Sequence, residues 1–186
     1  MIKAIVWDIG GVLIEDPKIK DFWGENKESK KLRDEFGTGK ISVNEFVKQG
    51  SRLLNLNEKD FLKEYKKAYF SIRLIKDVFN TFKKIKLQKY ILSDSNPLHA
   101  EYVKNNFKDI LRLTERTFFS HETGSRKSQE ESFNYMLKKI KMKSLEIVFI
   151  DNKKECTDTA KKLGIHTILF KNNIQLKKDL AKFGVK

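Results

Sequence analysis

The feature that most constrains this chain lies in its first dozen residues, where a short apolar run stops at an acid and two glycines. Residues 2–7 are mostly apolar and rich in β-branched side chains, which is typical of a strand buried on both faces. The run ends at Asp8, and Gly10 and Gly11 follow. Open parallel sheets bind ligands at the carboxyl ends of their strands, and glycine lets the backbone approach a ligand closely. The pattern predicts that Asp8 is a nucleophile or a metal ligand.

Strands and helices alternate in the second half of the chain, which predicts an α/β fold with a doubly wound parallel sheet. Asn96 followed by Pro97 predicts the start of one helix, and Ser128 with Glu131 predicts a capping box at another. The further strands are expected at residues 89–93, 117–120, 145–150 and 165–170.

The segment between the first two predicted strands shows helical patterns and no convincing strand. Ser42 and Glu45 form a second capping-box pattern, and Asn57 is a good N-cap for the helix that follows it. Apolar residues recur at helical spacing in both predicted helices, so we expect them to pack on one another. The predicted division is an α/β core of residues 1–14 and 83–186 and an all-α insert of residues 15–82.

Composition limits the classes of function. The net charge of +14 comes mostly from lysines scattered along the chain, which indicates a solvated basic surface and predicts no specific nucleic-acid partner. No apolar run reaches about 18 residues, so no membrane span is expected. We also expect no signal peptide and a cytoplasmic location, and the single cysteine, Cys156, excludes an internal disulfide. The expected assembly is a monomer or a homodimer.

Four polar residues stand at comparable places in this predicted fold. Asp8, Ser93 and Asp151 end predicted strands, and Lys127 precedes a predicted helix. Because the carboxyl ends of parallel strands share one edge of a sheet, we expect these side chains to converge. A divalent cation such as Mg²⁺ relieves repulsion between two carboxylates, and a hydroxyl with an ammonium group suits a phosphate. The sequence therefore predicts a pocket for an anion bridged to a metal ion.

The order and spacing of these motifs resemble the haloacid dehalogenase-like (HAD) hydrolase superfamily. The matching segments are residues 8–13, Leu92 and Ser93, Lys127, and residues 149–152. The helical insert lies between the first and second motifs, where that family carries its helical cap. Residues 92–99 and 124–127 are also similar to bacterial sugar-phosphate phosphatases of the α-glucose-1-phosphate type.

This resemblance implies a Mg²⁺-dependent phosphatase of a small phosphorylated metabolite, with sugar phosphates as one candidate class. Asp8 would attack phosphorus and form an aspartyl-phosphate that water hydrolyses. Ser93 and Asp94 would lie at the phosphoryl group, and Lys127 would neutralise its charge as the transition state forms. The implied metal ligands are Asp8, the main-chain carbonyl of Gly10, Asp151 and Asn152.

Several residues depart from the family pattern. Gly10 stands where most phosphatases of the superfamily carry a general acid, whose help is typically worth about 10²–10⁴ in rate. Asn152 replaces a frequent second metal-binding Asp, which predicts lower metal affinity unless Asp151 takes the role. Asp94 adds negative charge near the phosphate site, and Ser128 replaces a frequent Pro but is expected to cap the same helix.

Two alternatives remain open on the sequence. One is a metal-free 2-haloacid dehalogenase that uses Asp8 to displace halide, a reaction that needs no acid at position 10. The other is a catalytically weak HAD-like protein retained for binding or regulation, to which Gly10, Asp94 and Asn152 together point.

Overall fold

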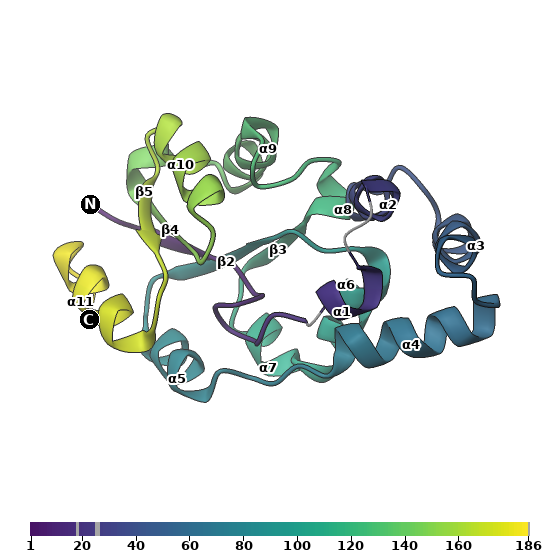
Figure 1. The fold of residues 1–186 in the computed structure, drawn as a ribbon. Helices are drawn as coiled ribbons and strands as arrows, with labels where there is room; N and C mark the ends of the chain where they lie inside the picture. The colour runs from purple at the N-terminus through teal and green to yellow at the C-terminus, as the bar shows by residue number, and fades with distance from the viewer. Residues whose placement is uncertain (18, 25–26, 186) are drawn as a thin grey trace.

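Five parallel strands form one sheet in the computed structural model, which describes residues 1–17, 19–24 and 27–185 (Figure 1). The strands are β1 (Ala4–Trp7), β2 (Gln88–Ser93), β3 (Arg116–Phe119), β4 (Ile147–Asp151) and β5 (His166–Leu169), in the spatial order β3-β2-β1-β4-β5. The central strand is β1, in which Val6 lies opposite Tyr90 of β2 and Phe149 of β4. The predicted α/β fold with a parallel sheet is confirmed.

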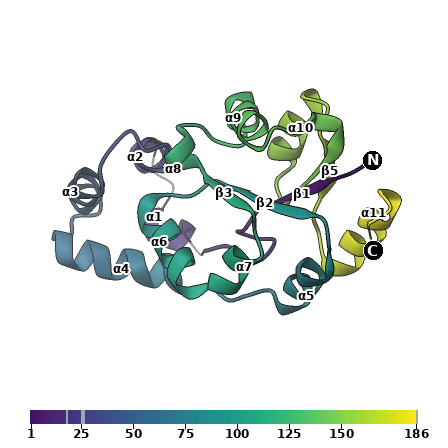
Figure 2. The same cartoon turned by 180° about the vertical axis from the view of Figure 1, so that it is seen from behind.

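Helices cover both faces of the sheet. Successive residues of β1 point to opposite faces, and the apolar side chains on each face need a covering layer. Ile5 and Trp7 belong to the apolar layer under α5, α6, α7 and α11, whereas Ala4 and Val6 belong to the layer under α9 and α10 (Figure 2). The bounds of these helices are α5 (Lys76–Lys84), α6 (Pro97–Asn106), α7 (Lys108–Arg112), α9 (Glu130–Ile140), α10 (Lys154–Lys162) and α11 (Asn173–Lys182), with α8 (Ser120–Thr123) after β3.

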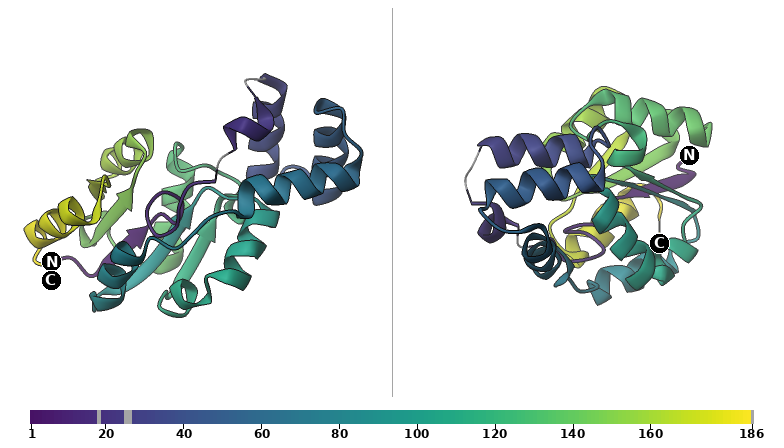
Figure 3. Two further views of the ribbon diagram at one scale, coloured as in Figure 1. Left: turned by 60° about the horizontal axis from the view of Figure 1, so that its bottom comes forward. Right: turned by 90° about the vertical axis from the view of Figure 1, so that its right-hand side faces the viewer.

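A separate group of helices, here called the cap helices, lies at the end of the sheet opposite the chain termini (Figure 3). They pack around an aromatic cluster of their own, in which the rings of Phe36 and Phe46 stack 3.9 Å apart. The predicted caps at Ser42 and Asn57 are confirmed by hydrogen bonds from the backbone of Glu45 and Asp60. The cap helices are α1 (Lys20–Trp23), α2 (Lys27–Gly37), α3 (Val43–Leu53) and α4 (Glu58–Phe70).

The chain passes between the core and the cap helices at one place. The backbone N–H of Glu15 donates to the carbonyl of Arg73, and that of Ile75 donates to the carbonyl of Leu13, each over 2.9 Å. Beyond this crossing, α5 returns under the sheet, where Phe82 lies edge-on to Trp7 with ring centroids 5.2 Å apart. The predicted boundary at residue 82 falls inside this helix.

The helix start predicted at Asn96 is confirmed, and the one predicted at Ser128 is not. Asn96 caps α6 through the backbone N–H of His99, and Pro97 is its first residue, as predicted. The prediction that Ser128 caps α9 is wrong, because α9 begins at Glu130 after Gln129, which makes no side-chain cap. No helix within the described ranges is long and apolar enough to cross a membrane.

Candidate active site

Lys127 lies between two carboxylates at the carboxyl end of the sheet. Asp8 follows β1, Asp151 ends β4, and Lys127 lies in the loop between α8 and α9. Its Nζ is 2.7 Å from Asp8 Oδ2 and 2.6 Å from Asp151 Oδ2. All three side chains are buried, and Asp151 has no exposed surface. The parallel topology thus brings together residues that are far apart in the sequence.

Backbone groups fix the position of each member of this triad. Asp8 Oδ1 accepts the N–H of Ile9, and Asp151 Oδ1 accepts the N–H of Lys153, each over 2.7 Å. The N–H of Lys127 donates to Asp94 Oδ1 over 2.9 Å. Asp94 therefore orients the loop that carries Lys127, a role that the sequence did not predict.

The buried charges alter the proton affinity of the triad. Burial, opposed by the ammonium of Lys127 and assisted by the charges of Asp151 and Asp94, raises the pKa of Asp8 to about 7. Burial lowers the pKa of Lys127, but the carboxylates of Asp8 and Asp151 outweigh it, so this pKa is raised above its usual value. Lys127 consequently remains a cation at neutral pH, and a positive charge is permanently available beside Asp8.

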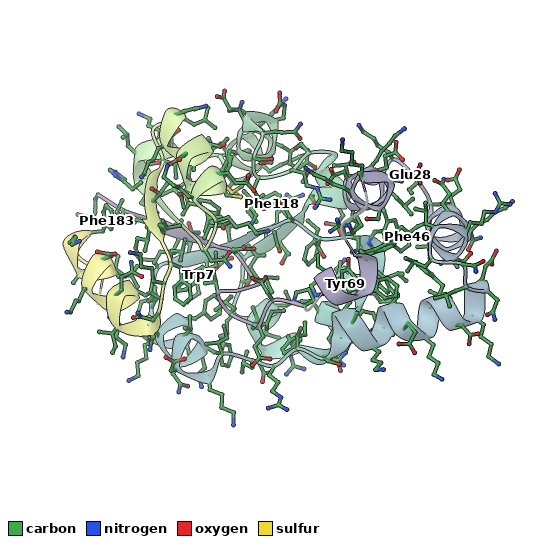
Figure 4. All side chains as sticks on the ribbon, in the orientation of Figure 1. Trp7, Glu28, Phe46, Tyr69, Phe118 and Phe183 are labelled. Atoms are coloured by element: carbon green, nitrogen blue, oxygen red, sulfur yellow. The ribbon has the colours of Figure 1, made fainter. Side chains whose placement is uncertain are left out.

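A cavity of about 740 Å³ opens above the triad, between the strand ends and the cap helices. The side chains of Phe46 and Tyr69, which line it from the cap helices, lie well away from Trp7 in the sheet (Figure 4). Asp151 is enclosed behind Lys127. The predicted site residues that line this cavity are Asp8, Gly10, Ser93, Asp94 and Lys127.

Asp8, the Gly10 carbonyl and Asn152 offer the carboxylate, carbonyl and amide oxygens that suit a magnesium ion. Within the described residues, no three His, Cys, Asp or Glu side chains gather into an ion site, so protein carboxylates alone would not hold the metal. Mg²⁺ commonly binds through one or two carboxylates and retains several waters. Asn152 Oδ1 is buried and has no hydrogen-bond partner among the residues that the structure describes, whereas both oxygens of Asp151 already accept hydrogen bonds. Asn152 therefore fits a ligand role better than Asp151.

Two further residues line the cavity, Asp16 and Arg126, and neither had a predicted role. Arg126 Nη2 donates to the carbonyl of Arg33 over 3.0 Å and to Asp34 Oδ1 over 3.2 Å, which ties the loop of Lys127 to α2. A Cβ at Gly37 would lie 2.3 Å from Arg126 Nη2, so glycine permits this approach. Both contacts join residues more than ninety positions apart, and no local pattern signals them.

A sequence model of haloacid dehalogenase-like hydrolases matches residues 2–164. The chain belongs to this family of HAD-like hydrolases. Among curated proteins, it is similar to a D-ribitol-5-phosphate phosphatase of Bacteroides thetaiotaomicron, with 24% identity over 203 residues that cover 97% of this chain and 98% of the relative.

Solved structures of HAD-family proteins share the fold. A HAD-family enzyme from Bacteroides thetaiotaomicron, in complex with magnesium and inorganic phosphate, superposes with a TM-score of 0.75 at 23% identity, covering 92% of this HAD-like hydrolase and 95% of that chain. A HAD-like hydrolase from Porphyromonas gingivalis gives a TM-score of 0.75 at 22% identity, covering 98% of both chains.

Proposed function

We propose that this HAD-like hydrolase is a Mg²⁺-dependent phosphatase of a small phosphorylated metabolite, with Asp8 as its nucleophile. The observation that carries this proposal is the contact of 2.7 Å between Lys127 Nζ and Asp8 Oδ2 at the floor of the cavity. A buried carboxylate beside a fixed cation can attack an anionic group whose charge the cation neutralises.

In the proposed reaction, an oxygen of Asp8 forms a bond to phosphorus while the bond from phosphorus to the leaving oxygen breaks. The product is an aspartyl-phosphate, which water hydrolyses to return the carboxylate. The hydroxyl of Ser93, which lines the same cavity, donates to a phosphoryl oxygen, and the ammonium of Lys127 neutralises the phosphoryl charge. Asp8, the Gly10 carbonyl and Asn152 would hold Mg²⁺, which would supply further positive charge near the phosphoryl group.

Gly10 restricts the substrates that such a site can use efficiently. It has no side chain, so position 10 cannot supply a proton to the leaving oxygen. Phosphates with good leaving groups, such as anomeric sugar phosphates and aryl phosphates, suffer least from this lack. Polar side chains such as those of Asp16, Asn96 and Arg126 line the cavity beside apolar ones, and they can bind hydroxyl groups. Together with the similarity to a polyol-phosphate phosphatase, they support sugar and polyol phosphates as the substrate class.

The test is phosphate release from a panel of sugar, polyol and aryl phosphates, with and without Mg²⁺, in the wild type and in Asp8→Asn. We expect Mg²⁺-dependent release that Asp8→Asn abolishes. Equal release by both proteins would disprove the role of Asp8. Release of halide from 2-haloacids without Mg²⁺ would instead establish the dehalogenase alternative. A folded protein that binds Mg²⁺ or phosphate and turns nothing over would establish the binding alternative.

A further inference from the structure

Asp16 folds back onto the loop that follows the proposed nucleophile. It lies eight positions after Asp8 and lines the same cavity. A Cβ at Gly10 would lie 2.9 Å from Asp16 Oδ1, and a Cβ at Gly11 would lie 2.6 Å from Asp16 Oδ2. The carboxylate of Asp16 therefore occupies the space that side chains at these two glycines would need.

This carboxylate also fixes the orientation of a side chain from the other half of the fold. Asn152 Nδ2 donates to Asp16 Oδ2 over 3.1 Å. A carboxylate only accepts hydrogen bonds, so turning the amide over would place two oxygens against each other. The amide nitrogen of Asn152 is therefore held by Asp16, and its Oδ1 faces away, buried and without a partner in the described part of the chain.

We propose that Asp16 is a positioning residue for the metal site, which locks Asn152 so that Oδ1 serves as a neutral ligand for Mg²⁺. This inference rests on the proposed use of Mg²⁺. In this arrangement, the oxygen that contacts the ion belongs to the amide of Asn152, and the negative charge lies one hydrogen bond further out, on Asp16. Groups that orient metal ligands in this way typically change metal affinity by about 10- to 100-fold when removed.

Calorimetric titration of the purified protein with MgCl₂ alone tests the inference without any turnover. Asp16→Ala is expected to weaken Mg²⁺ binding by about 10- to 100-fold, and Asn152→Ala by a similar factor. The double variant, which combines Asp16→Ala with Asn152→Ala, is expected to bind Mg²⁺ no more weakly than Asn152→Ala alone, because Asp16 acts through Asn152. Glu15→Ala, which removes the same charge at the adjacent position, is expected to leave the affinity within about twofold.

Asp16→Asn separates orientation from charge, because an asparagine there can still accept from Asn152 Nδ2 through its own oxygen. If Asp16→Asn binds Mg²⁺ nearly as tightly as the wild type, and much more tightly than Asp16→Ala, the result supports a role of Asp16 in positioning Asn152. Equal losses of Mg²⁺ affinity in Asp16→Asn and Asp16→Ala, or additive losses in the double variant, would overturn the positioning role in favour of a charge effect alone.

If the wild type binds no Mg²⁺, the proposed function fails at that point. If the wild type binds and Asp16→Ala binds equally well, only the role of Asp16 fails. Circular dichroism melts establish that each variant is folded.

Discussion

Lys127 Nζ lies 2.6 Å from Oδ2 of Asp151, a carboxylate with no exposed surface and with its other oxygen on the backbone N–H of Lys153. Both oxygens of Asp151 are thus occupied, one by the ammonium of Lys127 and the other by the backbone N–H of Lys153. This pairing leaves the second contact of the ammonium for Asp8, the residue that faces the cavity. The buried carboxylate of Asp151 therefore holds the ammonium of Lys127 next to Asp8.

Lys127→Met should destabilise the protein strongly. It leaves the carboxylates of Asp8 and Asp151 buried without their cation, a change that typically costs about 3–5 kcal/mol. Urea unfolding followed by circular dichroism measures this loss. The matched control is Lys154→Met, which removes an exposed pair with Asp158 and should leave the free energy of unfolding nearly unchanged. A loss in Lys127→Met no larger than that of the control would contradict the buried-triad description.

His99 should make the protein sensitive to acid. Burial lowers the pKa of His99 from its usual 6.5 to about 4, and its Nε2 has no hydrogen-bond partner within the described residues. The unfolded state therefore binds more protons between pH 6.5 and about 4, so stability falls as the pH falls through this window. The full shift corresponds to about 3 kcal/mol.

Urea unfolding at pH 7 and at pH 4.5 tests this prediction in the wild type and in His99→Phe. The difference in unfolding free energy between the two pH values should be smaller in the variant, because phenylalanine takes up no proton. Carboxylates contribute the same loss in both proteins and cancel in the comparison. Identical pH dependence in the two proteins would show that His99 makes no contribution.

Gly10→Ala should disturb the metal site only while Asp16 is present. The new Cβ would lie 2.9 Å from Asp16 Oδ1, so the carboxylate must move and its bond to Asn152 weakens. Titration with MgCl₂ should show a loss of about tenfold in the wild-type background. In the Asp16→Ala background, the same substitution should add no further loss. An equal loss in both backgrounds would mean that Gly10 acts through its own backbone.

Arg126→Ala should loosen α2 from the core. It removes the hydrogen bonds from the guanidinium to the carbonyl of Arg33 and to Asp34, and bonds to charged groups are typically worth about 1.5–3 kcal/mol. Hydrogen exchange read by mass spectrometry should show faster exchange in peptides of α2 and unchanged exchange in α9. Arg112→Ala, which removes an exposed pair with Asp109, should leave α2 unaffected. Unchanged exchange of α2 in Arg126→Ala would place the attachment of the cap helices elsewhere.

Local sequence signals predicted the parts of the fold that depend on local chemistry. The apolar run before Asp8, the cap at Asn57 and the Asn96–Pro97 pair each describe one strand end or helix start, and all three are found. The predicted cap at Ser128 is wrong because the side chain of the neighbouring Gln129 accepts the N–H of Arg126 and closes the turn before α9.

Contacts between distant residues set the limit of that prediction. Topology suffices to place Asp8, Lys127 and Asp151 at one edge, since parallel strands end together. The bond between Asn152 and Asp16 spans 136 positions and joins two loops, whose paths depend on packing in three dimensions. Leu145 shows the same limit locally, because it was expected in a strand but is 65% exposed in a short 3₁₀ helix, Ser144–Glu146, before β4.

The single crossing between residues 13–15 and 73–75 has an evolutionary consequence. Because the chain leaves the sheet and returns to it at neighbouring points, the intervening helices form an exchangeable module whose replacement leaves the strand order intact. The side chains that line the cavity from the cap helices and the triad at the strand ends therefore belong to different segments of the sequence. Evolutionary changes confined to that one continuous segment would reshape the cap side of the cavity while Asp8, Lys127 and Asp151 keep their contacts.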